Sequence, residues 1–371
     1  MSAPSLGYGI IGCGMMGQEH IRNIKLLGDA HVAAIFEPDA AMIARALELA
    51  SEAKPVASIG ELLSMPEVGC VLIASPNFRH VEQLEQISST RPLPVLVEKP
   101  LFTDIADAAR LKAIGERLPL VWVAMEYRYM PPVAAFINDA EKVTGGIRML
   151  TIREHRFPFL SKVGDWNRFN RNTGGTFVEK CCHFFDLMRL ILQSDPVRVM
   201  ASAGQAVNHL DERYDGKTPD IWDHGYVLID FANGARAMLE LAMFAEGSRY
   251  QEEISAVGPA GKIECLVPGP GRFWPAHLGE APTPQVIISP RNPPGPRALD
   301  IPVDPDLLAA GDHNGSTFYQ HRKFVDAVCG RSRVEVSLDD GLWAVATGQA
   351  AQRSAIEHRS VSLSGAGASA T

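Results

Sequence analysis

The sequence has no apolar stretch long enough to cross a membrane, and its N-terminus lacks the charged, apolar and small-residue segments of a secretory signal. Basic residues are fewer than acidic ones: 35 Lys and Arg stand against 43 Asp and Glu, which gives a net charge of −8. No basic run is present, so neither a nucleic-acid-binding surface nor a polybasic membrane anchor is indicated. We therefore expect a cytoplasmic protein that binds neither nucleic acid nor membrane.

The six cysteines are spread along the chain, and no two of them stand in a C-x-x-C spacing. Zinc sites and disulfide frameworks need closely spaced ligands or a repeated cysteine pattern. We therefore expect no metal site and no disulfide framework. With 371 residues and 46% hydrophobic content, the chain instead has enough apolar material for a large core divided between two domains.

Strand-like and helix-like segments alternate through the first third of the chain. This alternation is typical of an α/β fold with a doubly wound parallel sheet, and we place a Rossmann domain at residues 1–128. The strand-like segments are residues 8–11, 32–36, 71–74, 95–97 and 120–124.

Longer strand-like segments follow and predict a C-terminal α/β domain at residues 129–362 with a large, open, mostly antiparallel sheet. One face of this sheet should pack against the first domain, and the other should be exposed or paired in a homo-oligomer, a dimer or a tetramer. The strand-like segments are residues 147–156, 197–206, 226–231, 235–244 and 251–257, with a tight hairpin signal at Asn233-Gly234.

The end of the chain combines an irregular segment with two helices. Residues 267–305 are dense in Pro and Gly and predict an ordered excursion or lid instead of a long regular element. Residues 319–328 and 338–358 read as helices, whereas residues 363–371 look like a disordered tail.

A glycine turn joins the first strand to the first helix. Its three glycines permit, in order, a tight turn, a close approach to a pyrophosphate and close packing of helix on strand, while the helix N-terminus offers amide donors to phosphate. Glu37 ends the second strand about 20 residues later, where an acid binds ribose hydroxyls. That carboxylate would repel a 2′-phosphate, so we predict NAD as the cofactor, not NADP. We assign to the cofactor Gly12, Gly14, Met15, Met16, Gly17 and Glu37.

A second polar position follows residues 95–97, an apolar strand that ends in Glu98-Lys99-Pro100. In open α/β sheets, ligands bind beyond the carboxyl ends of the parallel strands, so Lys99 should face the crevice. Further polar side chains stand after the neighbouring strands. We assign to the cofactor site Ser75, Asn77, His80, Glu98, Lys99 and Arg128.

Further along, Gly174-Gly175 is followed by Glu179, His183 and Asp186. Together with the glycine turn, Ser75-Pro76-Asn77-Phe78-Arg79-His80 and Glu98-Lys99-Pro100, this pattern resembles the Gfo/Idh/MocA oxidoreductases over nearly the whole chain. The resemblance implies a Rossmann domain joined to an α/β domain with an open antiparallel sheet. It also implies NAD(P)-linked chemistry on sugars, inositols or related polyols.

The same resemblance implies roles by position. Lys99 matches the active-site lysine of the family, and His183 matches the histidine that handles the hydroxyl proton. Glu179 stands where most members carry Asp, and Lys180 stands where an apolar residue is usual. We take these four residues as the catalytic candidates.

If residues 179–186 are helical, Glu179, His183 and Asp186 share one helix face because they are spaced four and three residues apart. Oxidation of a secondary alcohol requires removal of the hydroxyl proton while hydride leaves carbon, and His is the side chain whose unperturbed pKa lies nearest neutrality. Lys99 can stabilise the developing alkoxide. Glu179 or Asp186 could fix the imidazole tautomer.

Residues 153–171 form a basic and aromatic segment in an acidic protein. Guanidinium groups bind anions bidentately, and aromatic faces pack on sugar rings, so this loop could hold a sugar that bears carboxylate, sulfonate or phosphate. The alternative is a solvated or subunit-interface loop. We assign to substrate binding Lys99, Arg153, His155, Lys162, Trp166, Arg168, Asp186 and His313, the last of which precedes a helix.

Three functions are compatible with these motifs. The first is an NAD-dependent dehydrogenase that acts on a secondary hydroxyl of a sugar, sugar acid or cyclic polyol. The second is an NAD-dependent glycoside hydrolase that oxidises its substrate transiently, for example a sulfoquinovosidase. The third is a non-catalytic NAD-binding sensor. Net consumption of NAD separates the first two.

Overall fold

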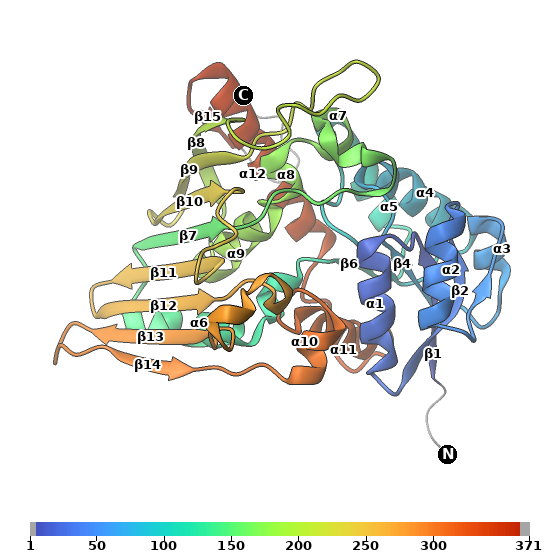
Figure 1. Cartoon of the computed structure of the whole chain (residues 1–371), viewed down its shortest axis with the longest axis horizontal. Helices are drawn as coiled ribbons and strands as arrows, with labels where there is room; N and C mark the ends of the chain where they lie inside the picture. Colours follow the sequence, from blue (N-terminus) through green and yellow to red (C-terminus); the bar gives the residue numbers. More distant parts are fainter. Residues whose placement is uncertain (1–4, 364–371) are drawn as a thin grey trace.

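The computed structural model of the chain describes residues 5–363 and arranges their strands in two sheets (Figure 1). The first sheet has six parallel strands in the order β3-β2-β1-β4-β5-β6, which confirms the doubly wound fold. Its strands are β1 (Leu6–Ile11), β2 (Ala30–Phe36), β3 (Lys54–Pro55), β4 (Cys70–Ile73), β5 (Val95–Val97) and β6 (Val121–Val123). Its helices are α1 (Met15–Lys25), α2 (Ala40–Leu49), α3 (Ile59–Ser64), α4 (His80–Thr90) and α5 (Ala108–Gly115).

The inner strands of this sheet are apolar on both faces because helices cover both of them, whereas the short edge strand β3 is exposed. All residues of β4, β5 and β6 are buried. Each fully buried Val, Leu or Ile side chain stabilises the fold by roughly 1.5–3 kcal/mol relative to exposure. The continuous apolar runs thus fix the strands in the sheet interior, and the first polar residue after each strand emerges at the carboxyl edge.

The second sheet has nine strands in the order β14-β13-β12-β11-β7-β10-β9-β8-β15. Neighbouring strands are antiparallel except β7 and β10, which are parallel, so the prediction of a large, mostly antiparallel sheet is confirmed. The strands are β7 (Met149–His155), β8 (Pro196–Gly204), β9 (His224–Phe231), β10 (Arg236–Ala242), β11 (Glu252–Gly258), β12 (Gly261–Val267), β13 (Gln285–Pro290), β14 (Arg297–Asp300) and β15 (Val361–Ser362).

One face of this sheet is packed and the other is open. A buried row runs across the packed face through the paired residues Val227, Leu239, Ile152, Ile254 and Cys265. Helices cover this face (Figure 1). The remaining helices of the chain are α6 (Pro131–Thr144), α7 (Asn170–Thr173), α8 (Thr176–Glu179), α9 (Cys182–Leu192), α10 (Pro305–Ala310), α11 (Ser316–Val328) and α12 (Leu338–Glu357).

The last two long helices join the two parts of the molecule. Phe324 of α11 and Leu342 of α12 belong to the same buried core as the six-stranded sheet. Trp343 and Ala351 of α12 lie in the core of the nine-stranded sheet. The C-terminal segment therefore packs on both sheets, and the boundary at residues 128 and 129 stays a prediction.

Two local predictions need correction. The segment 267–305 contains two strands, β13 and β14: Gln285–Pro290 alternates buried and partly exposed side chains and pairs with β12 on one side and β14 on the other. The expected helix over residues 179–186 is divided into α8, which ends at Glu179, and α9, which begins at Cys182. Residues 364–371, most of the predicted tail, lie outside the described residues.

No helix within residues 5–363 is long and apolar enough to cross a membrane. Over the same residues, no group of three His, Cys, Asp or Glu side chains could hold a metal ion.

Candidate active site

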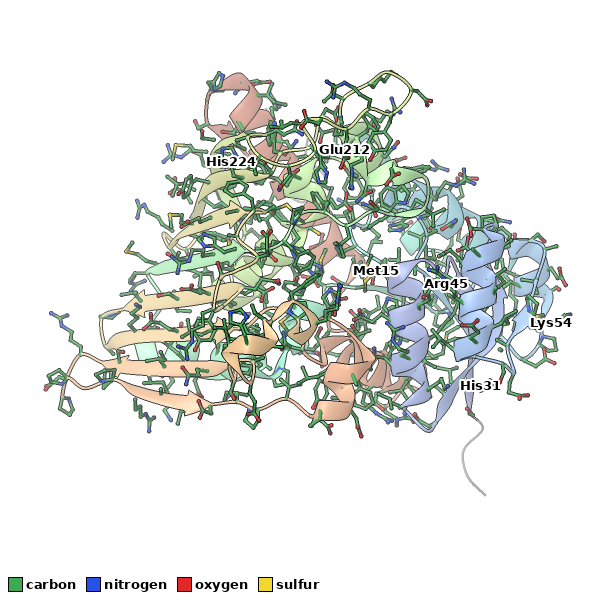
Figure 2. The ribbon with its side chains drawn as sticks, in the orientation of Figure 1. Met15, His31, Arg45, Lys54, Glu212 and His224 are labelled. Carbon is green, nitrogen blue, oxygen red and sulfur yellow. The ribbon has the colours of Figure 1, made fainter. Side chains whose placement is uncertain are left out.

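A cavity of about 1010 Å³ runs between the carboxyl edge of the six-stranded sheet and the nine-stranded sheet unit. Met15, at the start of α1, lies on the side of the first sheet that faces the second (Figure 2). We call this cavity the cleft. The strand ends supply one wall, and the loops after β7 and β12 and the start of α9 supply the other.

The glycine turn lies at one end of the cleft and fits a dinucleotide. Gly12 has φ of +92°, and a Cβ there would lie 2.6 Å from the Ser75 amide nitrogen. A Cβ on Gly17 would lie 2.4 Å from the Gly12 carbonyl oxygen, so only glycine lets α1 approach β1 this closely. By contrast, a Cβ on Gly14 would meet nothing within 4 Å, which leaves room for phosphate at a helix N-terminus without a side-chain cap.

Glu37 lies in the cleft at the end of β2, where the sequence places it. Its carboxylate accepts hydrogen bonds from the Cys13 amide at 2.6 Å and the Asp39 amide at 2.9 Å. These bonds fix the carboxylate beside the glycine turn while leaving lone pairs for ribose hydroxyls. When bound here, NAD supplies the hydride acceptor, and the residues present fit it.

Most of the other predicted cofactor residues also line the cleft. Ser75, Asn77 and Glu98 do so, and the buried Asn77 amide nitrogen has no partner within residues 5–363. His80 does not line the cleft; its Nδ1 lies 2.9 Å from the Pro100 carbonyl oxygen and its Nε2 lies 3.1 Å from the Ser75 carbonyl oxygen. His80 therefore connects two loops that form the cleft and does not itself reach into it.

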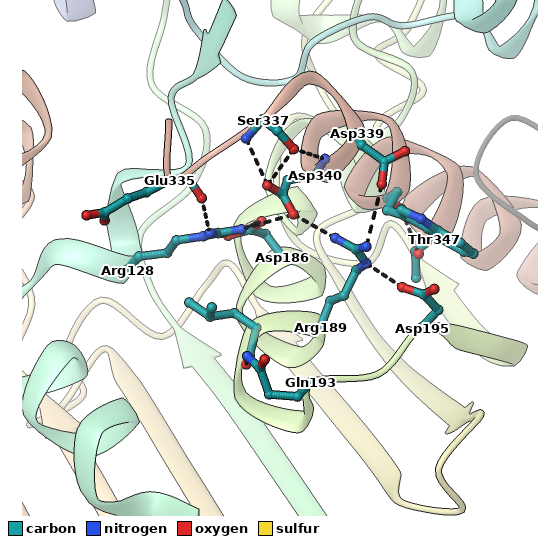
Figure 3. A network of polar contacts seen from close by, with 12 residues as sticks. Arg128, Asp186, Arg189, Gln193, Asp195, Glu335, Ser337, Asp339, Asp340 and Thr347 are labelled. Carbon is teal, nitrogen blue, oxygen red and sulfur yellow. Dashed lines mark hydrogen bonds and ion pairs between the residues drawn. The ribbon is translucent and has the colours of Figure 1, made fainter. Parts of the chain in front are cut away.

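Arg128 also lies outside the cleft, contrary to the prediction. Its guanidinium forms a buried two-point ion pair with Asp186, with Nε 2.5 Å from Oδ2, and donates to the Glu335 carbonyl oxygen (Figure 3). The same pair removes Asp186 from the substrate-binding set. Arg128 belongs to the 3-10 turn that follows β6, so this pair connects that turn to α9.

The four catalytic candidates meet at the centre of the cleft. Lys99, Glu179, Lys180 and His183 all line it, and the last three are at least 96% buried. The Lys99 ammonium donates to the Glu179 carbonyl oxygen at 3.0 Å. Burial by itself lowers the pKa of Lys99. The neighbouring Cys182, Glu179 and Glu98 raise it by more, so the net pKa lies above its usual value and Lys99 stays charged.

His183 is held neutral. Burial, followed by the charges of Lys99 and Lys180, keeps the pKa of His183 well below its usual value. Its Nδ1 is buried and has no hydrogen-bond partner within residues 5–363. Neither Glu179 nor Asp186 therefore fixes the tautomer, contrary to the expectation. A neutral imidazole beside a charged lysine can accept a proton from a substrate hydroxyl.

Only some side chains of the basic segment, residues 153–171, line the cleft. Lys162 and Trp166 line it, with the Lys162 ammonium 3.4 Å from the Glu179 Oε1 and 4.6 Å from the Trp166 ring centroid. Arg168 is buried and bonds Glu212 at 2.8 Å outside the cleft.

Arg153 and His155 lie outside the cleft for a simple reason. Side chains alternate along β7, so residues 149, 151, 153 and 155 all project from the open face. Arg153 pairs there with Glu253, and His155 lies 3.0 Å from Glu240. The sequence shows the basic residues, but their assignment to the substrate ignored the two-residue period of the strand.

His313 does line the cleft. Its Nδ1 lies 2.7 Å from the Glu19 Oε1 and its Nε2 lies 3.9 Å from the Glu126 Oε1. Burial lowers its pKa, but the Glu19 carboxylate raises it, and the net value is about 9. His313 is thus a cation beside Glu126, whose own pKa burial raises to about 7.

Sequence reasoning missed several cleft residues. Tyr127 lies in the 3-10 turn Glu126–Tyr129 and stacks on His183, while Glu252 of β11 and Arg156, which belongs to the basic segment 153–171 but was not singled out, flank Lys180. The sequence did hold one indication of these cleft residues. Residues 154 and 156 are charged, although the alternation of the strand places them at inward-facing positions.

The fold and this site define a class of protein, a dinucleotide-dependent oxidoreductase. Two family models match the chain: the NAD-binding Rossmann fold of the oxidoreductase family over residues 6–126 and its C-terminal alpha/beta domain over residues 140–363. The chain belongs to the Gfo/Idh/MocA oxidoreductase family.

Individual relatives agree with this assignment. The chain is 31% identical over 278 residues to an inositol 2-dehydrogenase of Corynebacterium glutamicum (strain R), which covers 73% of this chain and 76% of the relative. It is 25% identical over 277 residues to the rhizopine catabolism protein MocA of Rhizobium meliloti, which covers 74% and 80%. The crystal structure of a probable dehydrogenase from Thermotoga maritima has the same fold, with a TM-score of 0.76 at 23% identity over 96% of this chain and 98% of that one. The protein is an NAD-dependent oxidoreductase of the sugar and polyol type.

Proposed function

We propose that the protein oxidises a secondary hydroxyl on a cyclic polyol or a sugar ring, with His183 as the base and Lys99 as the electrostatic partner. The observation that carries this proposal is the joint position of the two residues. Lys99 stands at the carboxyl end of β5, where the nicotinamide end of a dinucleotide lies in this fold, and the neutral His183 faces the same cavity. Inositol dehydrogenase among the relatives supports the ring-shaped substrate.

In this mechanism, the substrate hydroxyl lies between the His183 imidazole and the Lys99 ammonium. His183 accepts the hydroxyl proton as the C–H bond loses its hydride, and Lys99 stabilises the negative charge that develops on oxygen. The products are a ketone, a reduced cofactor and a proton on His183. Glu179 acts by its backbone carbonyl, which holds Lys99, and by its carboxylate, which holds Lys162.

An anionic substituent on the ring would meet Lys162 and Arg156. The Arg156 Nε is buried and has no hydrogen-bond partner within residues 5–363, so it offers a free donor at the cleft. We keep an anionic sugar or polyol as the finer form of the proposal. A higher kcat/KM for a sugar acid than for its neutral parent supports it, and the reverse order contradicts it.

One observation favours the glycosidase alternative. A second cavity of about 690 Å³ shares Met15, Glu19 and Leu160 with the cleft, and its lining includes several prolines of the segment 267–305. A glycosidic group attached to the reacting ring would have space there. In that reaction the cofactor is regenerated in each cycle. Parallel assays of NADH absorbance and aglycone release separate the two functions, because only the dehydrogenase accumulates NADH.

We further propose that the protein forms a homo-oligomer through the open face of the nine-stranded sheet. Met200, Leu228 and Tyr226 are exposed on neighbouring strands of this face, and Met149 is exposed at the end of β7. An exposed cluster of large apolar side chains is typical of a subunit interface. Removal of this surface from water would stabilise a dimer or a tetramer.

A further inference from the structure

Tyr127 and His183 form a parallel stack at the centre of the cleft. Their ring centroids lie 4.1 Å apart, and the ring planes differ by 8°. Tyr127 comes from the 3-10 turn after β6, whereas His183 comes from the first turn of α9. Both side chains are buried. The tyrosine ring thus covers one face of the imidazole and fixes the plane in which its nitrogens lie.

This stack replaces the usual means of orienting a catalytic imidazole. A base histidine is commonly held by a carboxylate or carbonyl that accepts from its second nitrogen. The His183 Nδ1 has no such partner within residues 5–363. Its orientation therefore depends on packing, and Tyr127 is the side chain that packs in parallel with it.

Lys180 contacts the tyrosine of this stack. Its ammonium donates to the Tyr127 hydroxyl oxygen at 2.7 Å and lies 2.8 Å from the Glu154 Oε1. It also lies 4.8 Å from the Tyr127 ring centroid. The order of contacts is therefore Glu154, Lys180, Tyr127 and His183, which runs from the buried face of β7 to the reacting centre.

The geometry points to Tyr127 and Lys180 as positioning residues for His183: Tyr127 stacks on the imidazole and fixes its plane, and the Lys180 ammonium anchors the Tyr127 hydroxyl and adds a positive charge to the surroundings of the imidazole. The inference rests on the proposed role of His183 as the base. It gives a function to Lys180, whose side chain is therefore not a proton carrier for the substrate. The positive charge of Lys180 disfavours the imidazolium, because like charges repel in a buried site.

Other charges also face His183 and influence its pKa together with Lys180. Burial is the largest influence, and each of the neighbouring cations lowers the pKa of His183 in the same direction. These cations are Lys99 after β5, Lys180 between α8 and α9, His313 before α11 and Arg156 after β7. Removal of Lys180 should therefore shift the pKa upward without returning it fully to its usual value.

The first test is Lys180→Met, which keeps the length of the side chain and removes its charge. We expect the pKa of His183 to rise by about one unit. Because His183 must be neutral to act as a base, the acidic limb of kcat/KM should move to higher pH by the same amount. The ring signal of His183 in protein labelled with [¹³C]histidine reports this pKa without cofactor or substrate, and the His183→Gln variant assigns it.

Lys180→Met leaves Glu154 without its ammonium partner, so the double variant Lys180→Met/Glu154→Gln provides a neutral replacement for the pair. Lys180→Arg should restore the low pKa, because it restores the charge. Lys162→Met is the matched control: it removes another cleft cation, which faces Glu179 and Trp166, and should leave the His183 signal in place. An unchanged His183 pKa in folded Lys180→Met and in the double variant overturns the inference.

Tyr127 is tested with two variants that separate its ring from its hydroxyl. Tyr127→Phe keeps the stack and should retain kcat within about threefold, whereas Tyr127→Leu removes the stack and should lower kcat by about tenfold or more with little change in KM. Equal losses in both variants would contradict the stack as the feature that positions His183, because Tyr127→Phe retains the ring. If no substrate is oxidised at all, the proposed function fails, while the histidine titration still decides the inference.

Discussion

The Arg128 guanidinium and the Asp186 carboxylate form a buried ion pair that connects the turn after β6 to α9 (Figure 3). Both side chains are less than 10% exposed. Asp186 lies one helical turn beyond His183, so the pair fixes the end of α9 that carries the base. Asp340, at the start of α12, lies 3.6 Å from the same guanidinium and extends the network to the helix that joins the two sheets.

Removal of one partner from this pair should destabilise the protein strongly. Asp186→Ala leaves the Arg128 guanidinium buried without its carboxylate, and we expect a loss of about 3–5 kcal/mol in the free energy of unfolding. Asp230→Ala is the control, because its partner Arg198 is 52% exposed and such a pair contributes about 1 kcal/mol or less. Urea denaturation measures both variants. Equal losses would show that the buried pair has no special role.

The sequence predicted five of the six strands of the first sheet, because these five are apolar runs between clear turns; it missed β3, which is only the exposed pair Lys54–Pro55. It also placed Lys99 correctly, since the carboxyl end of a buried parallel strand can face only one edge of the sheet. Asp186 was misplaced for a different reason. Spacing rules assume one straight helix, and the break between Glu179 and Cys182 depends on packing that the sequence does not display.

In the second domain, too, several residues were misplaced or missed because the sequence alone does not display how they pack. Arg153 and His155 were assigned to the substrate by composition, whereas the alternation of β7 places them on the open face. Tyr127 was missed because its stack on His183 joins residues 56 positions apart, and the sequence carries no local signal for such a contact. β13 and β14 were hidden by the prolines and glycines around them.

Glu37 should determine cofactor preference. In Glu37→Gln the negative charge that repels a 2′-phosphate is lost, together with the strongest acceptor for ribose hydroxyls. We expect NADH to bind about 10-fold more weakly, because a charge-assisted hydrogen bond contributes about 1.5–3 kcal/mol, and the discrimination against NADPH to fall. Fluorescence titration with both cofactors measures these changes. Glu48→Gln, an exposed change on α2, is the control and should alter neither affinity.

Glu19 should control the charge of His313. Burial lowers the pKa of His313 and Glu19 raises it, to a net value of about 9, so His313 is protonated at neutral pH. Glu19→Gln removes the carboxylate that favours the imidazolium, and the pKa of His313 should therefore fall. A histidine titration by NMR reads it directly. Glu61→Gln, on the distant helix α3, should have no effect; a His313 signal that is equally unmoved in Glu19→Gln would contradict the prediction.

The open sheet face should hold the subunits together. Leu228→Arg places a charge in the middle of the exposed apolar cluster, and we expect the oligomer to dissociate, because burial of an unpaired charge is costly. Ile356→Arg introduces the same charge at an exposed position on α12, away from the sheet face, and should not change the assembly. Sedimentation velocity gives the state of each variant. If the parent protein itself sediments as a monomer, the proposed homo-oligomer is wrong.

The central claim is that His183 and Lys99 oxidise a secondary hydroxyl with NAD. The direct measurement is NADH absorbance when the protein is mixed with NAD and a panel of inositols, sugars and sugar acids, with aryl glycosides assayed in parallel. The account predicts NADH in step with consumed substrate, and a fall in kcat of about 10²–10⁴ in His183→Ala with NADH binding retained, and a comparable fall in Lys99→Ala. Turnover within a few-fold of the parent in both variants would contradict it, as would aglycone release without net NADH.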